Sequence, residues 1–445
     1  MDKEYLIHEK PLKALIVFAL PMMIGNLFQQ FYTMADSMVV GRFVSEDALA
    51  AVGASYSLTN VFICIAIGGG VGASVITGRY FGARNYKKMK QSSYTALVAF
   101  LCLSIFLAAF GLLVSKDIMR LLNTPKTILD MATQYLNIYF LGLPFLFMYN
   151  VLSAMFNAIG KSKFPLYLLI FSSILNILLD LYMVYILNMG VTGVAWATFL
   201  AQGISAIISF ALFLKIISSH TVQQTSIFDG KELKNMSRIA FPSILQQSTV
   251  AIGMMLVQSV VNSFGTQMLA GFSAAMRVES IAIVPMAAMG NAISAFTAQN
   301  MGAKEYERAR KGYYTSYGIV AFFALTNCIV LEVFHNRIIS LFLGSDGTML
   351  AQETGASYLK FMGWFFVLIG LKMITDGLLR GAGDMKVFTI ANLANLFIRV
   401  SFASIMAPRF GISMVWYAVP IGWLTNYVIS FAQYRTGKWR YIEIK

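Results

Sequence analysis

Two aspartates lie in stretches that are otherwise almost wholly apolar, and they have the strongest claim to chemistry. Asp36 and Asp180 each fall inside a predicted membrane span, which needs roughly 20 apolar residues. A carboxylate at the bilayer centre costs roughly 2.5–3.5 kcal/mol on insertion scales, so it requires a partner, a proton or a bound ion. Both are therefore candidate functional groups. The alternative is that they form hydrogen bonds within a packed core.

Two further polar residues accompany Asp180. Asn176 precedes it by four residues, which places an amide oxygen and a carboxylate on one helix face. Thr198, eighteen residues later in the next apolar stretch, offers a hydroxyl. Oxygen groups arranged in this way are suited to binding a cation inside a membrane.

The composition excludes a soluble protein. Of the 445 residues, 58% are hydrophobic and only 12% are charged. The 34 Lys and Arg residues outnumber the 20 Asp and Glu residues, but most of them lie in short loops between apolar stretches, where they act as topology signals. We therefore expect a lipid bilayer, and no nucleic acid, as the macromolecular partner.

Twelve apolar stretches are long enough to be membrane helices. If the N-terminus is cytoplasmic, 24 basic residues fall inside and 6 outside, so we expect both termini in the cytoplasm and a location in the cell (inner or plasma) membrane. The predicted spans are residues 12–40, 48–78, 92–115, 129–158, 165–187, 191–214, 237–265, 268–296, 312–334, 350–379, 387–407 and 411–435.

The two halves of the sequence resemble each other. Phe18-Ala-Leu-Pro21 aligns with Ile239-Ala-Phe-Pro242, and Gly82-Ala-Arg84 aligns with Gly302-Ala-Lys304, at an offset of about 220 residues. Because each half has an even number of spans, both halves enter the membrane from the same side.

This repeat predicts the fold class. We expect an all-α membrane protein with twelve transmembrane helices in two parallel six-helix repeats around a central cleft, as in an alternating-access transporter. A channel, a membrane enzyme and a scaffold are the alternatives, and no catalytic or nucleotide motif favours an enzyme. The predicted parts are an N-lobe over residues 1–214, a cytoplasmic linker over 215–236 and a C-lobe over 237–445.

The two halves differ in charge. In the repeat alignment Asp36 falls opposite Gln258, and Asp180 falls opposite Arg399. Acids that only braced the bundle would be needed in both halves. The difference therefore favours an ion-coupling site in the N-lobe alone.

The C-lobe contains its own charges within predicted spans. Lys372 and Asp376 are four residues apart on one helix face, and we predict that they pair. Glu279 is predicted to meet Arg399 across helices, with contact to a cationic ligand in the cleft or a place in a proton path as the alternatives.

A set of motifs spread over the chain carries a family resemblance. They are ALPMMIGNLFQQFYTMADSMVVGRF, the Gly-Ala-Arg loop, NAIGKSKFP, NILLD and AQNMGAKEYERAR. As a set they are specific, and the chain resembles the multidrug and toxic compound extrusion (MATE) family over nearly its whole length. The resemblance implies an antiporter, not an enzyme, that expels amphipathic, mostly cationic organic compounds or drugs against an inward flow of protons or sodium ions. We expect no other cofactor and a functional monomer.

The resemblance also implies a cation site. Where the family has an Asp, Asn, Asp and Thr set, this chain has Asp36, Asn176, Asp180 and Thr198, which implies binding of H⁺ or Na⁺ there. The pattern looks more like the DinF-like branch, whose coupling site is in the first lobe, than the NorM-like branch. The nearest alternative is a lipid or lipid-linked sugar flippase of the same superfamily, which usually needs a basic cavity.

A proline and a group of span residues complete the candidate site. Pro21 interrupts the helical hydrogen bonding of the first span, and we interpret it as a hinge, with a static kink as the alternative. Polarity and depth within the spans select the candidate substrate-cleft residues, which are Phe28, Gln29, Gln30, Tyr32, Tyr139, Tyr149, Asn150 and Glu279.

Overall fold

The regular structure of the described chain is entirely helical. The computed structural model describes residues 4–122, 124–219, 226–343 and 347–442, without the side chains at 35–37, 39–43, 46, 49 and 57. Within these ranges the chain forms helices and no strand. The predicted all-α fold class is confirmed.

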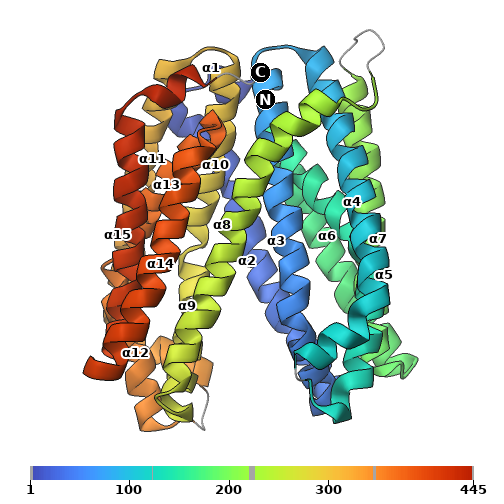
Figure 1. Cartoon of the computed structure of the whole chain (residues 1–445), viewed down its shortest axis with the longest axis vertical. Helices are drawn as coiled ribbons and strands as arrows, with labels where there is room; N and C mark the ends of the chain where they lie inside the picture. The colour runs from blue at the N-terminus through green and yellow to red at the C-terminus, as the bar shows by residue number, and fades with distance from the viewer. Residues whose placement is uncertain (1–3, 123, 220–225, 344–346, 443–445) are drawn as a thin grey trace. The chain divides into compact units, whose positions relative to one another are not determined.

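The helices belong to two compact units (Figure 1). We call Ile24–Ile244 the N-unit, and Met1–Met23 together with Leu245–Lys445 the C-unit. Helices α2 (Pro11–Phe43) and α8 (Gly230–Asn262) each contribute to both units. The other N-unit elements are α3 (Glu46–Gly82), α4 (Tyr86–Leu121), α5 (Lys126–Ala158), α6 (Lys163–Asp180), the π-helix η1 (Leu181–Ile186) and α7 (Gly190–Ser218).

The C-unit holds the remaining helices. They are α1 (Tyr5–His8), α9 (Thr266–Ala282), α10 (Val284–Gly302), α11 (Tyr306–Leu343), α12 (Met349–Gly363), α13 (Phe366–Ala382), α14 (Met385–Phe410), α15 (Ser413–Arg435) and the 3₁₀ helix η2 (Lys438–Tyr441). The division of the chain into lobes at residues 215–236 stays a prediction.

The helices are long and apolar enough to cross a membrane many times. Ten spans of the described chain satisfy this requirement, and the pair α12 and α13, which is bent by 56°, raises the number to eleven. The remaining predicted span is α15, which falls outside this set and carries the buried polar residues Asn426 and Ser430. Each predicted span thus corresponds to one helix or one broken helix, and the multi-pass membrane protein is confirmed.

Helices α2 and α8 pass from one unit to the other at corresponding positions. The change follows Met23 in α2 and Ile244 in α8, two residues after Pro21 and Pro242 respectively. Both helices continue through the proline without a break. The proline therefore lies where each helix leaves one packed body and enters the other.

The first residues of the chain are anchored within the C-unit. Tyr5, Leu6 and Phe18 belong to one buried apolar cluster with Phe296 of α10 and side chains of α11, α13 and α15. The backbone oxygen of Leu6 accepts hydrogen bonds from Asn300 Nδ2 and Arg308 Nη2, each at 3.2 Å.

Small residues bring α10 and α13 into backbone contact. A Cβ atom on Gly377 would lie 2.2 Å from the Gly290 oxygen, and one on Gly381 would lie 2.3 Å from the Ser294 oxygen. Such close approach is how membrane helices gain van der Waals contact. It also places the polar face of α13 inside the bundle.

That face of α13 carries a buried ion pair. Lys372 Nζ lies 3.4 Å from Asp376 Oδ2, as the sequence predicts, and both side chains are buried. Asp376 also accepts hydrogen bonds from Asn392 Nδ2 at 3.2 Å and Ser430 Oγ at 2.7 Å. These bonds tie α13 to α14 and α15, and they satisfy the buried carboxylate.

We predict that Lys372→Met lowers the free energy of unfolding in detergent by about 3–5 kcal/mol, because it leaves the Asp376 charge buried without its cation. The double variant Lys372→Met/Asp376→Leu should recover most of this loss, since it removes both charges. Chemical denaturation followed by tryptophan fluorescence measures all three proteins.

The exposed ion pair between Lys360 and Glu332, with an N–O distance of 3.3 Å, is the matched control. Lys360→Met should change the free energy of unfolding by about 1 kcal/mol or less. If Lys360→Met and Lys372→Met lower the free energy of unfolding equally, Lys372 is not needed to neutralise the buried charge of Asp376.

Candidate ion and substrate site

Helix α6 turns a polar face inward and an apolar face outward. Its buried residues are Leu168, Ser173, Asn176 and Asp180, and the last two are only 2% and 0% exposed. The opposite face carries exposed Phe171, Ile174 and Leu178. In a helix of a soluble protein the apolar face is buried and the polar face is exposed. Here the faces are reversed, because lipid replaces water outside the bundle.

Hydrogen bonds join three helices of the N-unit at Asn176. Its Oδ1 accepts a hydrogen bond from the Tyr32 hydroxyl of α2, and its Nδ2 donates to Thr198 Oγ1 of α7 at 3.4 Å. Asn176 and Thr198 therefore lie together, although 22 residues separate them in the sequence. Tyr32, selected from the sequence as a cleft residue, belongs to this polar cluster.

The two aspartates differ in what the structure describes. Both carboxylate oxygens of Asp180 are enclosed, one helical turn from Asn176. The backbone of Asp36 is part of α2, but its side chain lies outside the described residues. A shared site of Asp36 and Asp180 therefore stays a prediction.

A π-helix follows Asp180 directly, and the sequence reasoning missed it. Leu181–Ile186 form this segment, and Leu187 N donates to the Tyr182 oxygen at 3.1 Å across the wider turn. A π-helix inserted into an α-helix often marks a functional position. The segment LYMVYI contains no Gly or Pro that signals the change.

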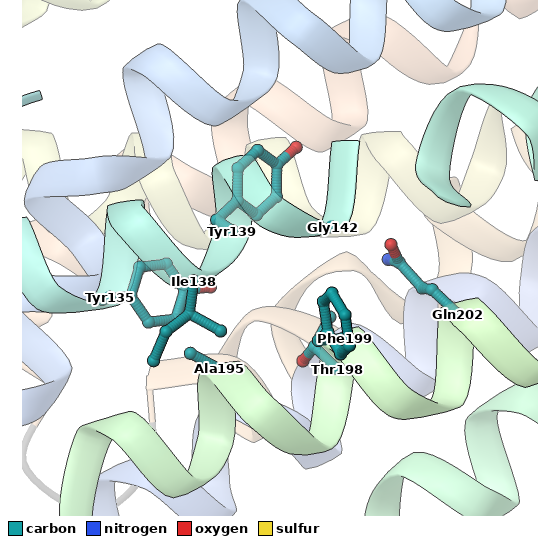
Figure 2. A pocket seen from close by; sticks show the side chains of 8 residues that line it. All are labelled: Tyr135, Ile138, Tyr139, Gly142, Ala195, Thr198, Phe199 and Gln202. Atoms are coloured by element: carbon teal, nitrogen blue, oxygen red, sulfur yellow. The ribbon is translucent and has the colours of Figure 1, made fainter. Parts of the chain in front are cut away.

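A small, partly open pocket lies between α5 and α7 (Figure 2). Figure 2 shows Tyr135 and Tyr139 on α5, with Phe199 and Gln202 on α7. The residues that line the pocket are Tyr135, Ile138, Tyr139, Gly142, Ala195, Thr198, Phe199 and Gln202. The lining combines aromatic rings with hydroxyl and amide groups.

Two of the predicted site residues meet in this pocket. Tyr139 lines it, and its hydroxyl donates to the Thr59 oxygen at 3.3 Å. Thr198 also lines it and accepts the bond from Asn176. The proposed cation ligands and the pocket are therefore connected through a single side chain.

The other predicted cleft residues lie elsewhere. None of them lines this pocket, and Asn150 Nδ2 donates locally to the Leu146 oxygen at 2.8 Å. Phe28, Gln29 and Gln30 lie on α2 next to Tyr32, whereas Tyr149 and Asn150 lie on α5, two turns or more beyond Tyr139. Their contact with substrate stays a prediction.

Glu279 is buried in the C-unit near the end of α9, with 3% exposure. Its carboxylate accepts a hydrogen bond from the Tyr358 hydroxyl of α12. Arg399, the predicted partner, is an electrostatic neighbour but forms no ion pair within 4 Å among the described residues.

No dense metal centre accompanies these residues in the described part of the chain. Groups of three or more His, Cys, Asp or Glu side chains that converge on one point do not occur there. The mixed set of amide, hydroxyl and carboxylate oxygens at Asn176, Thr198 and Asp180 suits a proton or Na⁺ better than a transition metal.

Comparison with known proteins places the chain among membrane transporters. The family model described as MatE matches residues 21–182 and 242–405, two segments that begin at Pro21 and Pro242. The probable multidrug resistance protein YpnP of Bacillus subtilis is 30% identical over 437 residues, which cover 97% of each chain. The multidrug export protein MepA of Staphylococcus aureus is 23% identical and matches 93% of this chain and 92% of its own.

Solved structures agree with this placement. The crystal structure of MATE in complex with MaL6 matches with a TM-score of 0.92 at 25% identity, over 99% of this chain and 100% of that chain. Family model, relatives and fold agree over nearly the full length. The chain therefore belongs to the MatE family of multidrug efflux transporters, and it is not an enzyme.

Proposed function

We propose that the chain is an H⁺- or Na⁺-coupled antiporter that extrudes amphipathic, mostly cationic organic compounds by alternating access. Coupling occurs through Asp36 and Asp180, with Asn176 and Thr198 as the other ligands of the ion. We also propose that the chain belongs to the DinF-like branch and works as a monomer in the cell membrane with both termini in the cytoplasm.

The shared position of Thr198 is the observation that carries this proposal. Its hydroxyl accepts the hydrogen bond from Asn176, and the same side chain lines the pocket between α5 and α7. An ion bound at Asp180 and Asn176 therefore changes the hydrogen-bonding state of a residue that faces the ligand. Differential contact of this kind is what coupling between two sites requires.

The pocket supports the substrate class. The ring of Phe199 packs edge to face against Phe145 and Trp196, at centroid distances of 5.3 and 5.1 Å. Aromatic faces attract organic cations, and apolar rings bury their hydrocarbon parts. The names of YpnP and MepA, a resistance and an export protein for many drugs, agree with a broad substrate range.

Ion loading would be transmitted through α2. Binding of H⁺ or Na⁺ neutralises the carboxylates. This changes the strength of the hydrogen bond that the Tyr32 hydroxyl donates to Asn176. Because α2 leaves the C-unit after Met23, a bend at Pro21 moves the N-unit part of the helix while its first turns stay anchored.

Replacing Asp180 with Asn should abolish drug extrusion, because the amide keeps the shape of the carboxylate but cannot exchange its charge for an ion. Cells that lack their own pumps and express Asp180→Asn or Asp36→Asn should retain ethidium as cells without the protein do. The measurement is ethidium fluorescence against time, normalised to the amount of protein in the membrane.

The control is Asp117→Asn, the same chemical change at a residue whose side chain is 77% exposed. It should extrude ethidium at the rate of the unchanged protein. Full extrusion by both Asp180→Asn and Asp36→Asn would remove the proposed coupling site.

Proteoliposomes with an imposed pH gradient or an imposed Na⁺ gradient should identify the ion. We expect ethidium movement with one of the two gradients and none without a gradient. If Na⁺ is the ion, Thr198→Val should raise the Na⁺ concentration for half-maximal transport by about tenfold, since one oxygen ligand is lost.

Thr192→Val, in the first turn of the same helix, is the control for Thr198→Val. Among the described residues, the Thr192 hydroxyl donates only to the Met189 oxygen, at 2.7 Å. Transport that responds to neither gradient would overturn the antiport proposal. Flipping of a fluorescent lipid in the same vesicles, without ethidium movement, would favour a flippase instead.

A further inference from the structure

One exposed face of α11 has no part in the mechanism proposed above, and its character changes along the helix. Phe322 and Ile329 are each more than half exposed, as side chains that face lipid are. Lys311 precedes them by 11 and 18 residues, which are three and five whole turns, so it lies on the same face. Tyr314, which is 49% exposed, lies one turn from Lys311. The lipid-facing stripe of α11 thus ends in a tyrosine and a cation.

Helix α15 has a comparable face. Leu424 is 49% exposed and Val428 is 55% exposed. Ala432 and Arg435 continue this face at intervals of three or four residues, and both are exposed. A lipid-facing stripe therefore ends in a basic residue on each of the two helices.

Helices α11 and α15 lie beside α13 in the C-unit (Figure 1), and tyrosine side chains connect them. The Tyr317 hydroxyl lies 3.2 Å from the Tyr427 hydroxyl, and the ring centroids of Tyr314 and Tyr434 are 6.2 Å apart. Tyrosine combines an apolar ring with a polar hydroxyl, and it is enriched where membrane helices meet the lipid headgroups. The aromatic contacts therefore mark this end of the two helices as the headgroup level.

The segment after α15 folds back onto this end of the C-unit. Gly437 makes the turn with a φ of 70°, and Trp439 of η2 is only 1% exposed, with its ring stacked 6.0 Å from that of Tyr434. Arg440 Nη1 then lies 3.1 Å from a carboxylate oxygen of Glu307 in the first turn of α11. A buried tryptophan and an ion pair thus hold η2 against α11.

Basic residues outnumber acidic ones where these elements meet. Lys311, Arg435 and Lys438 are exposed, and they form no ion pair with any residue that the structure describes. The first two turns of α11, the last turn of α15 and η2 together carry five basic residues and one carboxylate, which are Arg310, Lys311, Arg435, Lys438, Arg440 and Glu307. We call these six residues, with Tyr314 and Tyr427, the α11–α15 surface.

A topology signal is the simplest alternative for these cations, since basic residues in loops orient a membrane protein. Such a signal acts through its charge during insertion and needs no folded arrangement. Here Glu307 accepts both Arg310 Nε and Arg440 Nη1, each at 3.1 Å, so one carboxylate joins two chain segments and leaves an excess of positive charge. That arrangement is suited to an anion that stays bound in the mature protein.

We propose that the α11–α15 surface binds an anionic phospholipid from the leaflet on the side of the chain termini. Lys311, Arg435 and Lys438 meet the phosphate, because basic residues at the ends of membrane helices attract anionic headgroups. The acyl chains lie along the exposed faces of α11 and α15, where a Cβ atom on Gly318 would meet nothing within 4 Å. This leaflet is the cytoplasmic one in the orientation proposed above, but the binding itself does not rest on the transport proposal.

The test compares two lipids that share their acyl chains and differ in charge. Purified protein in detergent is titrated with dioleoyl phosphatidylglycerol or dioleoyl phosphatidylcholine, and native mass spectrometry counts the bound lipid. We expect tighter binding of phosphatidylglycerol. Because each cation near the headgroup changes binding by about fivefold, Lys311→Gln/Lys438→Gln should raise the Kd of phosphatidylglycerol by at least about tenfold. The Kd of phosphatidylcholine should change by less than about twofold.

Lys87→Gln/Lys163→Gln is the matched control, because it removes two exposed lysines of the N-unit that the sequence assigns to the same side of the membrane. It should change the Kd of phosphatidylglycerol by less than about twofold. Thermal unfolding without added lipid checks the folding of each variant, and Arg435→Gln/Lys438→Gln repeats the test if the first double variant is unstable. Equal weakening by the test and control variants would show that phosphatidylglycerol responds only to overall charge, and would overturn the proposal.

Two further results would also overturn it. The first is an unchanged protein that binds both lipids equally well. The second is displacement of phosphatidylglycerol by an equal concentration of glycerol 3-phosphate, which has the phosphate but no acyl chains. Failure of the antiport proposal is a separate result, since it appears as ethidium movement that ignores both ion gradients and leaves these lipid-binding constants unchanged.

Discussion

The cost of a charge in an apolar bundle is the constraint on which this molecule depends. Asp180 is fully buried, and α6 therefore keeps Asn176 on the same face, in contact with hydroxyl groups from α2 and α7. In the C-unit the buried carboxylate of Asp376 is neutralised instead by an ion pair with Lys372. One repeated fold thus carries different electrostatics in its two halves, and function follows the side chains.

Much of the fold could be predicted from the sequence, since a membrane span needs only length and apolarity to be recognised. Helical periodicity was enough to predict that Lys372 pairs with Asp376 and that Asn176 and Asp180 share a buried face. The repeat was visible because both halves keep the same turns and prolines. These features are local, or recur at one fixed offset.

Features that depend on how helices cross could not be predicted in this way. The pocket needs α5 and α7 to bring Tyr135 and Phe199 to one space, and no spacing within either helix encodes that meeting. Tyr32 was selected by depth and polarity, and only the packing of α2 on α6 shows that its hydroxyl reaches Asn176; its contact with substrate stays a prediction. The π-helix after Asp180 has no Gly or Pro in its own sequence to indicate it.

The exchange of helix ends between the units has a consequence for biogenesis. The Leu6 oxygen accepts hydrogen bonds from Asn300 and Arg308, so the ribosome must add 294 and 302 further residues after Leu6 before these contacts can form. The start of α2 thus enters the bilayer long before its final neighbours exist. The buried cluster that holds Leu6 and Phe18 also includes Tyr434 and Trp439, so the amino-terminal segment reaches its native contacts only when translation is nearly complete.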